Sequence, residues 1–130
     1  MQEACRPARA DKKQSLGVSG LHRGVQAYTA RTLFARASDV LAKAGLTHKD
    51  VGLFLFTQVN LSTIKEVMKG MNLPMSRTHT VIQKWGYTGS ACIPTVLDDA
   101  VHEGKLKPGD TLVICASGGG LNLACTAFRW

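Results

Sequence analysis

Two apolar runs without alternation stand out along the chain, at residues 51–56 and 111–116. A strand that is exposed on one face alternates apolar and polar side chains, whereas a strand covered on both faces does not. We therefore expect two buried strands. A short strand is also expected at residues 78–82, a closing strand at residues 121–130 and an extended piece at residues 22–28, which makes five strands in all.

Between these strands the apolar residues recur every three or four positions, which is the spacing of one helix face. The pattern predicts helices at residues 29–44, 61–71 and 90–103, and glycines follow the first and the third. The second helix carries Met68 and Met71 on its apolar stripe, where we expect them to fill the core.

Strands that alternate with helices predict an α/β fold, in which a mostly parallel sheet is covered by helices on both faces. The last two strands are joined only by a short glycine link at residues 117–120, so we expect the last strand to be antiparallel. The predicted architecture is a three-layer α/β/α domain with a mixed five-stranded sheet at residues 21–130. Residues 1–20 lack periodicity and carry excess Lys and Arg, and they are predicted to be a disordered basic tail.

Polar bends follow three of the expected strands, at residues 57–60, 87–90 and 117–120. The carboxyl ends of parallel strands line the ligand crevice in open α/β sheets. This placement makes Tyr87 and Thr88 the first candidates for chemistry. A tight structural turn remains the alternative, because one short glycine-rich segment is a weak signal.

The formal charge of +7 and the pI near 9.5 permit a nucleic-acid partner. No aromatic and basic residues interleave into a base-stacking surface, however, so nucleic acid is not the expected partner. An acidic protein or a phosphorylated carrier fits the charge equally well. No apolar run is long enough to span a bilayer and the N-terminus lacks a signal-peptide core, so we predict a soluble cytoplasmic protein without membrane contact.

The cysteines and histidines indicate no metal site, because none of them cluster at ligand spacing. Most of the four cysteines lie in apolar stretches, where buried free thiols are expected. Asp98 and Asp99 are neighbours on the third helix, point about 100° apart and are expected to be solvated.

At the three bends the chain resembles the C-terminal half of β-ketoacyl-acyl carrier protein synthase III, a condensing enzyme of the thiolase superfamily. The similarity runs from about Val25 to Trp130. It is carried jointly by the Lys43-Ala44-Gly45-Leu46 helix end, Gln58-x-Asn60, Gly86-x-Thr88, Ile93-Pro94, Lys107-Pro108-Gly109-Asp110, Gly118-Gly119-Gly120-Leu121 and Arg129-Trp130.

This resemblance implies one of two pseudo-symmetric halves that meet at an active site. The nucleophilic cysteine of the family belongs to the N-terminal half, and none of the cysteines here stands in its motif. The chain is therefore expected to need an N-terminal condensing-enzyme half, in the same or another polypeptide, and to form a homo- or hetero-oligomer that covers its apolar face.

The resemblance also implies site residues. Thr57 stands where the family has a catalytic histidine and Tyr87 where it has an asparagine, while Gly119 matches the glycine whose N–H completes an oxyanion hole. Substrate-binding roles are implied for Gln58, Asn60 and Thr88.

The implied substrates are acyl-CoA or acyl carrier protein thioesters, in which coenzyme A or phosphopantetheine is part of the substrate and no further cofactor is bound. Losing one oxyanion donor typically costs about 10²–10³ in rate, so we expect decarboxylation to be weak or replaced by plain acyl transfer. Ser62 replaces a basic carrier-docking residue, and Lys65 and Lys69 are candidates to take over, or are simply a solvated face. The alternative is a non-catalytic fragment or scaffolding subunit.

Overall fold

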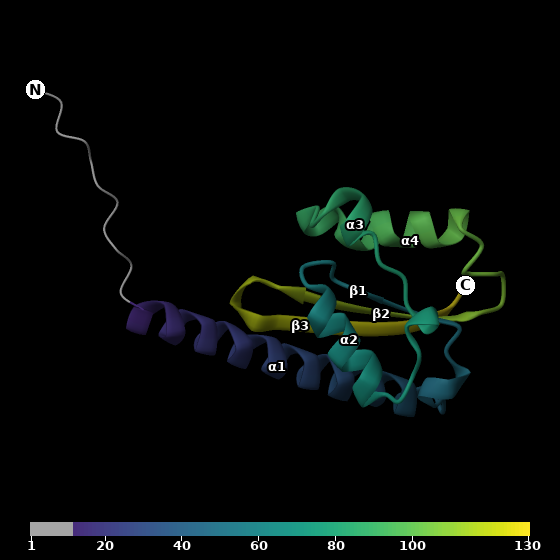
Figure 1. Ribbon diagram of the computed structural model, residues 1–130. Coiled ribbons are helices and arrows are strands. Elements are labelled where there is room, and N and C mark those ends of the chain that lie inside the picture. The colour runs from purple at the N-terminus through teal and green to yellow at the C-terminus, as the bar shows by residue number, and fades with distance from the viewer. Residues whose placement is uncertain (1–11) are drawn as a thin grey trace, which may run out of the picture.

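A computed structural model describes the backbone of residues 12–130 and the side chains of residues 25–130 (Figure 1). Its main elements are α1 (Lys12–Lys43), β1 (Leu53–Phe56), α2 (Leu61–Gly70), α3 (Ile82–Trp85), α4 (Cys92–His102), β2 (Thr111–Gly118) and β3 (Asn122–Arg129). Short 3-10 turns occupy His48–Asp50, Met75–Arg77, Gly89–Ala91 and Gly119–Leu121. The order confirms helices before and after β1 and a final hairpin of two strands, whereas α2, α3 and α4 follow one another between β1 and β2 without an intervening strand.

The sheet has the order β1-β2-β3 and is mixed, as the sequence predicts. β1 pairs in parallel with β2, with Leu53 opposite Leu112 and Phe56 opposite Cys115. β3 returns antiparallel to β2 after the glycine link, which confirms the expected direction of the last strand.

Helices cover both faces of this sheet, so the three-layer α/β/α architecture is confirmed (Figure 1). On one face α1 and α2 bury a core with the side chains of β1 and β2 that point toward them. On the other face α4 buries the alternate side chains. The two cores contain Ala30, Leu33, Ala37, Leu41, Phe54, Phe56, Ile64, Val67, Met68, Met71, Val113 and Cys115 on the first face, and Leu53, Leu55, Val81, Val96, Ala100, Leu106 and Leu112 on the second.

The prediction of five strands is wrong for the described residues, which form three. The segment predicted to be extended at residues 22–28 belongs to α1, which begins well before residue 29 and runs without a break from Lys12 to Lys43. At residues 78–82 a single bridge joins Thr78 to Phe54. The Thr78 hydroxyl donates to the Phe54 carbonyl at 2.7 Å, and the chain then turns into α3 instead of extending the ladder.

The prediction of a disordered tail at residues 1–20 can be compared with the structure only from residue 12 onward, where it is wrong. Residues 1–11 lie outside the described residues, and residues 12–20 belong to α1. Although α1 has 32 residues, neither it nor any other helix within residues 12–130 offers an apolar stretch suited to crossing a bilayer.

Substituting Leu41→Ala should lower the free energy of unfolding by about 2–5 kcal/mol, because Leu41 is buried between α1 and the sheet and its loss leaves a cavity. Urea denaturation measures the effect. The matched control, Arg31→Ala on the exposed side of α1, should change it by less than about 0.5 kcal/mol. Equal effects of the two substitutions would contradict the placement of α1.

Candidate active site

The bends that follow β1 and β2 are joined by hydrogen bonds at one end of the sheet. The Ser117 N–H donates to Thr57 Oγ1 at 2.8 Å, and the Thr57 N–H donates to the Cys115 carbonyl at 3.3 Å. The Thr57 hydroxyl in turn donates to the Ser117 carbonyl across 3.4 Å, which is near the limit of a hydrogen bond. Thr57 is thus fixed as an acceptor, while its own hydrogen is only weakly engaged.

A pocket of about 280 Å³ opens beside this junction. It lies between α1, the end of β1, the first turns of α2 and the end of β2. Its walls are mostly apolar, with a few hydroxyl and amide groups among them. The lining residues are Val25, Gln26, Thr29, Leu33, Phe56, Thr57, Val59, Asn60, Thr63, Ile64 and Ser117. A concave, mostly apolar site with a few polar groups is typical of small-molecule binding.

Asn60 caps α2 and also lines this pocket. Its Oδ1 accepts from the Ser62 N–H at 3.0 Å and from the Ser62 hydroxyl at 2.7 Å. The oxygen is therefore occupied by the helix start. The amide nitrogen of Asn60 remains as a donor for a ligand.

Gln58 is fully buried and bonds inside the protein. Its Nε2 donates to the Phe56 carbonyl at 2.8 Å, and its Oε1 accepts from the Val81 N–H at 3.0 Å. These bonds tie the end of β1 to the segment that leads into α3. The structure gives Gln58 the contacts of a positioning residue, whereas the resemblance implied direct substrate binding.

Tyr87 and Thr88 lie in the bend between α3 and α4. Gly86 and Gly89 flank them with φ of +68° and +60°, values that side chains rarely adopt, which is why the bend requires glycine. The Tyr87 side chain is 51% exposed. Among the described side chains, Thr88 Oγ1 is the buried polar atom that lacks a hydrogen-bond partner.

Gly119 begins the 3-10 turn between β2 and β3, two residues beyond Ser117. The Asn122 side chain donates to the Gly119 carbonyl at 2.7 Å and so fixes this peptide. The structure therefore brings Thr57 and Asn60 to the pocket, with Gly119 close by in sequence. Tyr87 and Thr88 are not among the lining residues, although their bend lies at the same end of the molecule (Figure 1).

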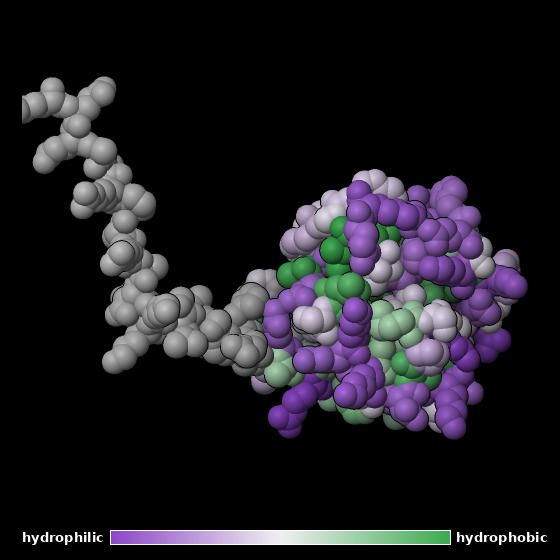
Figure 2. Space-filling model, viewed as in Figure 1, coloured by the Kyte–Doolittle hydropathy of each residue, from purple (hydrophilic) through white to green (hydrophobic). Residues whose placement is uncertain are grey.

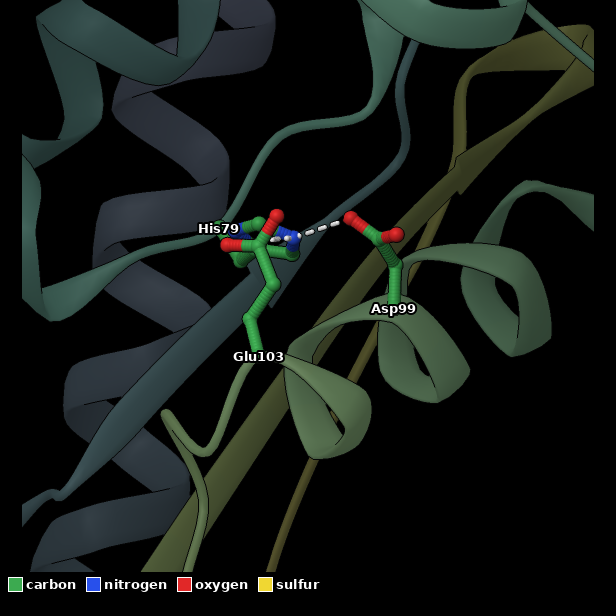
Figure 3. A group of neighbouring side chains, drawn as sticks. All are labelled: His79, Asp99 and Glu103. Atoms are coloured by element: carbon green, nitrogen blue, oxygen red, sulfur yellow. Dashed lines mark hydrogen bonds and ion pairs between the residues drawn. The ribbon is translucent and has the colours of Figure 1, made fainter.

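A charged network around the buried His79, beside α4, was missed by the sequence reasoning. His79 is almost fully buried, and its Nε2 lies 2.7 Å from Asp99 Oδ2 (Figure 3). Lys105 Nζ lies 2.8 Å from the other ring nitrogen of His79. Lys84 Nζ lies 2.7 Å from both Asp99 and Glu103. The sequence signal was weak: Asp99 and Glu103 are four residues apart and share one helix face.

The prediction that both neighbouring aspartates are solvated is therefore wrong for Asp99. The Asp99 side chain is 12% exposed, whereas that of Asp98 is 75% exposed. The difference arises because Asp99 faces His79 in the segment before α3 and Lys84 on α3. Since Lys84 precedes the Gly86 bend by two residues, this ion pair fastens the bend of Tyr87 to α4.

His79, Asp99 and Glu103 have the composition of a metal site, with ligand atoms within 4.8 Å of one another (Figure 3). Two ammonium groups, those of Lys84 and Lys105, already bind these atoms. A cation placed among them would be repelled by both lysines. The hydrogen bond from Lys84 lowers the pKa of Asp99 and of Glu103, and the bond to Asp99 raises the pKa of Lys84. The group therefore has the chemistry of an internal ion network.

Known proteins resemble this chain in sequence and in fold. The family of the 3-oxoacyl-[acyl-carrier-protein (ACP)] synthase III C terminal matches residues 41–130. The beta-ketoacyl-[acyl-carrier-protein] synthase III of Syntrophomonas wolfei is 37% identical over 103 residues, which cover 79% of this chain and 31% of the relative. Its counterpart in Aquifex aeolicus is 37% identical over 92 residues, which cover 71% of this chain and 30% of the relative.

Solved structures agree with the sequence relatives. The 3-oxoacyl-[acyl-carrier-protein] synthase III from Aquifex aeolicus superposes with a TM-score of 0.81 and 33% identity, over 84% of this chain and 35% of that chain. The synthase III from Thermus thermophilus gives a TM-score of 0.79 and 31% identity, over 83% of this chain and 34% of that chain. The chain thus spans about a third of the length of the curated relatives it matches.

The ion network should make stability fall in acid. Because the pKa of Asp99 and of Glu103 is lowered by folding, their contribution is present above the ordinary carboxyl range and is lost as the pH falls through the folded values, below about pH 4.5. Urea midpoints measured from pH 7 to pH 3 should drop less steeply for Asp99→Asn than for the wild type. Asp98→Asn is the control and should keep the wild-type slope. Identical slopes for all three proteins would show that the network does not act in solution.

Proposed function

Because the chain belongs to the family of 3-oxoacyl-acyl carrier protein synthase III C-terminal domains, we propose that it is the C-terminal half of an acyltransferase that acts on acyl-CoA or acyl-carrier thioesters. The observation that carries this proposal is the pocket beside the Thr57–Ser117 junction. It lies where the carboxyl ends of two parallel strands meet, which is the usual place for ligands in such sheets.

The walls of the pocket suit the arm of a pantetheine thioester. That arm alternates methylene groups with amides, and the pocket offers apolar walls from Val25, Leu33 and Ile64. The amide nitrogen of Asn60 would donate to a carbonyl of the arm, and the Thr29 hydroxyl, which itself donates to the Val25 carbonyl at 2.8 Å, would accept from an N–H of the arm. The acyl end would then reach the Thr57 side of the pocket.

Thr57 and Gly119 are the groups that we assign to the thioester oxygen. Ser117 holds Thr57 Oγ1 as an acceptor, so its weakly engaged hydrogen can turn toward a ligand at little cost. The Gly119 N–H would be a second donor. Tyr87 carries an exposed hydroxyl on the neighbouring bend and would donate when substrate and partner close over it.

We propose that an N-terminal condensing-enzyme half supplies the nucleophilic cysteine and covers the active-site end. Large apolar side chains are exposed on the bends there, namely Val59, Tyr87 and Leu121. Figure 2 shows hydrophobic (green) surface between hydrophilic (purple) areas toward the left of this view, the end at which the bends lie in Figure 1. Such surface is normally covered by a partner. Lys65 and Lys69, both exposed on α2, would attract an acidic carrier protein.

The second candidate function is a non-catalytic subunit that binds a thioester or a partner without turning it over. The placement of the described cysteines favours it. Cys92 and Cys115 are buried, and Cys125 is half-buried on the α1 side of the sheet. None of the three lines the pocket, so the described part of the chain offers no cysteine nucleophile there.

Acetyl-CoA should bind the 130-residue chain. The substitution Thr63→Tyr should weaken this binding about tenfold or more, because the tyrosine ring would fill the pocket. Isothermal titration calorimetry measures the affinity. Glu66→Tyr lies on the same helix but does not line this pocket, so it should leave the affinity within about twofold. If both variants bind like the wild type, the thioester does not occupy this pocket.

Together with its N-terminal half, the wild-type chain should decarboxylate a malonyl thioester slowly, because Thr57 and Tyr87 replace the stronger donors of the family. The double substitution Thr57→His and Tyr87→Asn should raise the rate by about 10²–10³. Release of carbon dioxide measures the reaction. Binding of acetyl-CoA by both proteins is the control for folding. A wild-type rate equal to that of an ordinary synthase III would refute the loss of decarboxylation.

A further inference from the structure

Two thiols face each other across the β2–β3 hairpin. Cys115 and Cys125 are directly opposed in the antiparallel register, and both are free cysteines. Both pack into the core layer between the sheet and α1. Cys115 is fully buried, whereas Cys125 is partly open to solvent.

The backbone geometry brings these side chains close. The Cys115 carbonyl accepts from the Thr57 N–H, so the backbone polar groups of Cys115 point toward β1 and away from β3. Cys115 and Cys125 are therefore a non-hydrogen-bonded pair, the kind in which side chains approach most closely and the Cα atoms lie about 4.5 Å apart. A disulfide requires a Cα separation of about 4.4–6.8 Å, so the hairpin can be bridged with little movement of the backbone.

We propose that Cys115 and Cys125 are a thiol redox pair, which a small-molecule disulfide oxidises reversibly to a cross-strand disulfide. Cys125 is the attacking thiol because it is the accessible member of the pair. Cys115 is the resolving thiol because it lies buried behind Cys125 on the adjacent strand.

The pKa shifts of the two thiols agree with Cys125 as the attacking thiol and Cys115 as the resolving thiol. The hydrogen bond from Cys115 lowers the pKa of Cys125, partial burial opposes this effect, and the Arg36 guanidinium on α1 adds to it. The same hydrogen bond, together with burial, raises the pKa of Cys115. A thiolate is the nucleophile in disulfide exchange, so the first attack falls to Cys125.

The chemistry balances in two steps. The Cys125 thiolate attacks one sulfur of oxidised glutathione, forms a mixed disulfide and releases one glutathione thiolate. Cys115 then loses its proton, attacks the Cys125 sulfur and releases the second glutathione. The two protein thiols lose two electrons and two protons in total, and oxidised glutathione gains them as two molecules of glutathione.

The disulfide would lock the hairpin immediately before the bend of Ser117 and Gly119. Cys115 precedes Ser117 by two residues, and its carbonyl already binds Thr57. Oxidation would therefore stiffen the loop beside the pocket. Packing of the two cysteines as small apolar side chains is the competing explanation, and it requires no reactivity from either.

The full 130-residue chain, folded and reduced, is incubated with oxidised glutathione, and the remaining free thiols are alkylated before peptide mapping by mass spectrometry. We expect a peptide pair joined through Cys115 and Cys125, which dithiothreitol reverses. Cys92 is buried at the start of α4, the helix that covers the opposite face of the sheet, and should be recovered alkylated only after unfolding. Cys125 should react at least about tenfold faster than Cys92 in the same molecules.

Single variants distinguish the two roles. Cys115→Ser should stop at the mixed disulfide of Cys125 with glutathione, and Cys125→Ser should abolish both products. Cys92→Ser is the matched control and should form the cross-link at the wild-type rate. Equal reactivity of Cys92 and Cys125 in the wild type, a cross-link to Cys5 instead, or a cross-link that forms only in urea would overturn the proposal, even if a serine variant fails to fold.

Discussion

The parallel pairing of β1 with β2, buried on both faces, determines where the helices and the candidate site lie. Leu53 to Phe56 lie wholly in the interior, so a helical layer is required above and below them. The pairing also sets both carboxyl ends at the same edge. Thr57 and Ser117 meet there and join the two bends through the backbone and one hydroxyl.

Much of this arrangement is predictable from the sequence because it depends on local patterns. The apolar run at residues 51–56 marks the buried strand, and the short glycine link at residues 117–120 marks the antiparallel return of β3. The stripe of Ile64, Val67 and Met68 marks the helix face that reaches the core. Each of these signals needs only the periodicity of its own segment.

The predictions that were wrong depended on tertiary partners. Thr78 forms one bridge to Phe54, and its hydroxyl donates a hydrogen bond to the Phe54 carbonyl. Three residues later, the Gln58 side chain accepts the hydrogen bond of the Val81 N–H. Side chains thus replace the ladder that a longer strand would have formed. Asp99 has the local pattern of a solvated helix residue, and only the approach of His79 from a distant loop buries it. Similarly, the resemblance could identify Gln58 but not the bonds that turn it inward.

The candidate site lies at the carboxyl ends of β1 and β2, where the pocket, the Asn60 cap and the glycine turn come together. In the proposed function Thr57 and Tyr87 donate to the thioester through their hydroxyl groups. The ion pair of Lys84 with Asp99 joins α3 to α4 and so holds the Tyr87 bend between them, away from the pocket. In the proposed function this site holds a thioester, and the proposed partner half supplies the nucleophile for the reaction.

Amide hydrogen exchange of the 130-residue chain, with and without acetyl-CoA, shows whether the ends of β1 and β2 form one thioester site. We expect the ligand to slow exchange in residues 57–63 and 117–120, since both bends border the same pocket, and to leave residues 99–105 unchanged. Protection of one bend without the other, or protection confined to residues 99–105, would contradict the claim that the ends of β1 and β2 form a single thioester site.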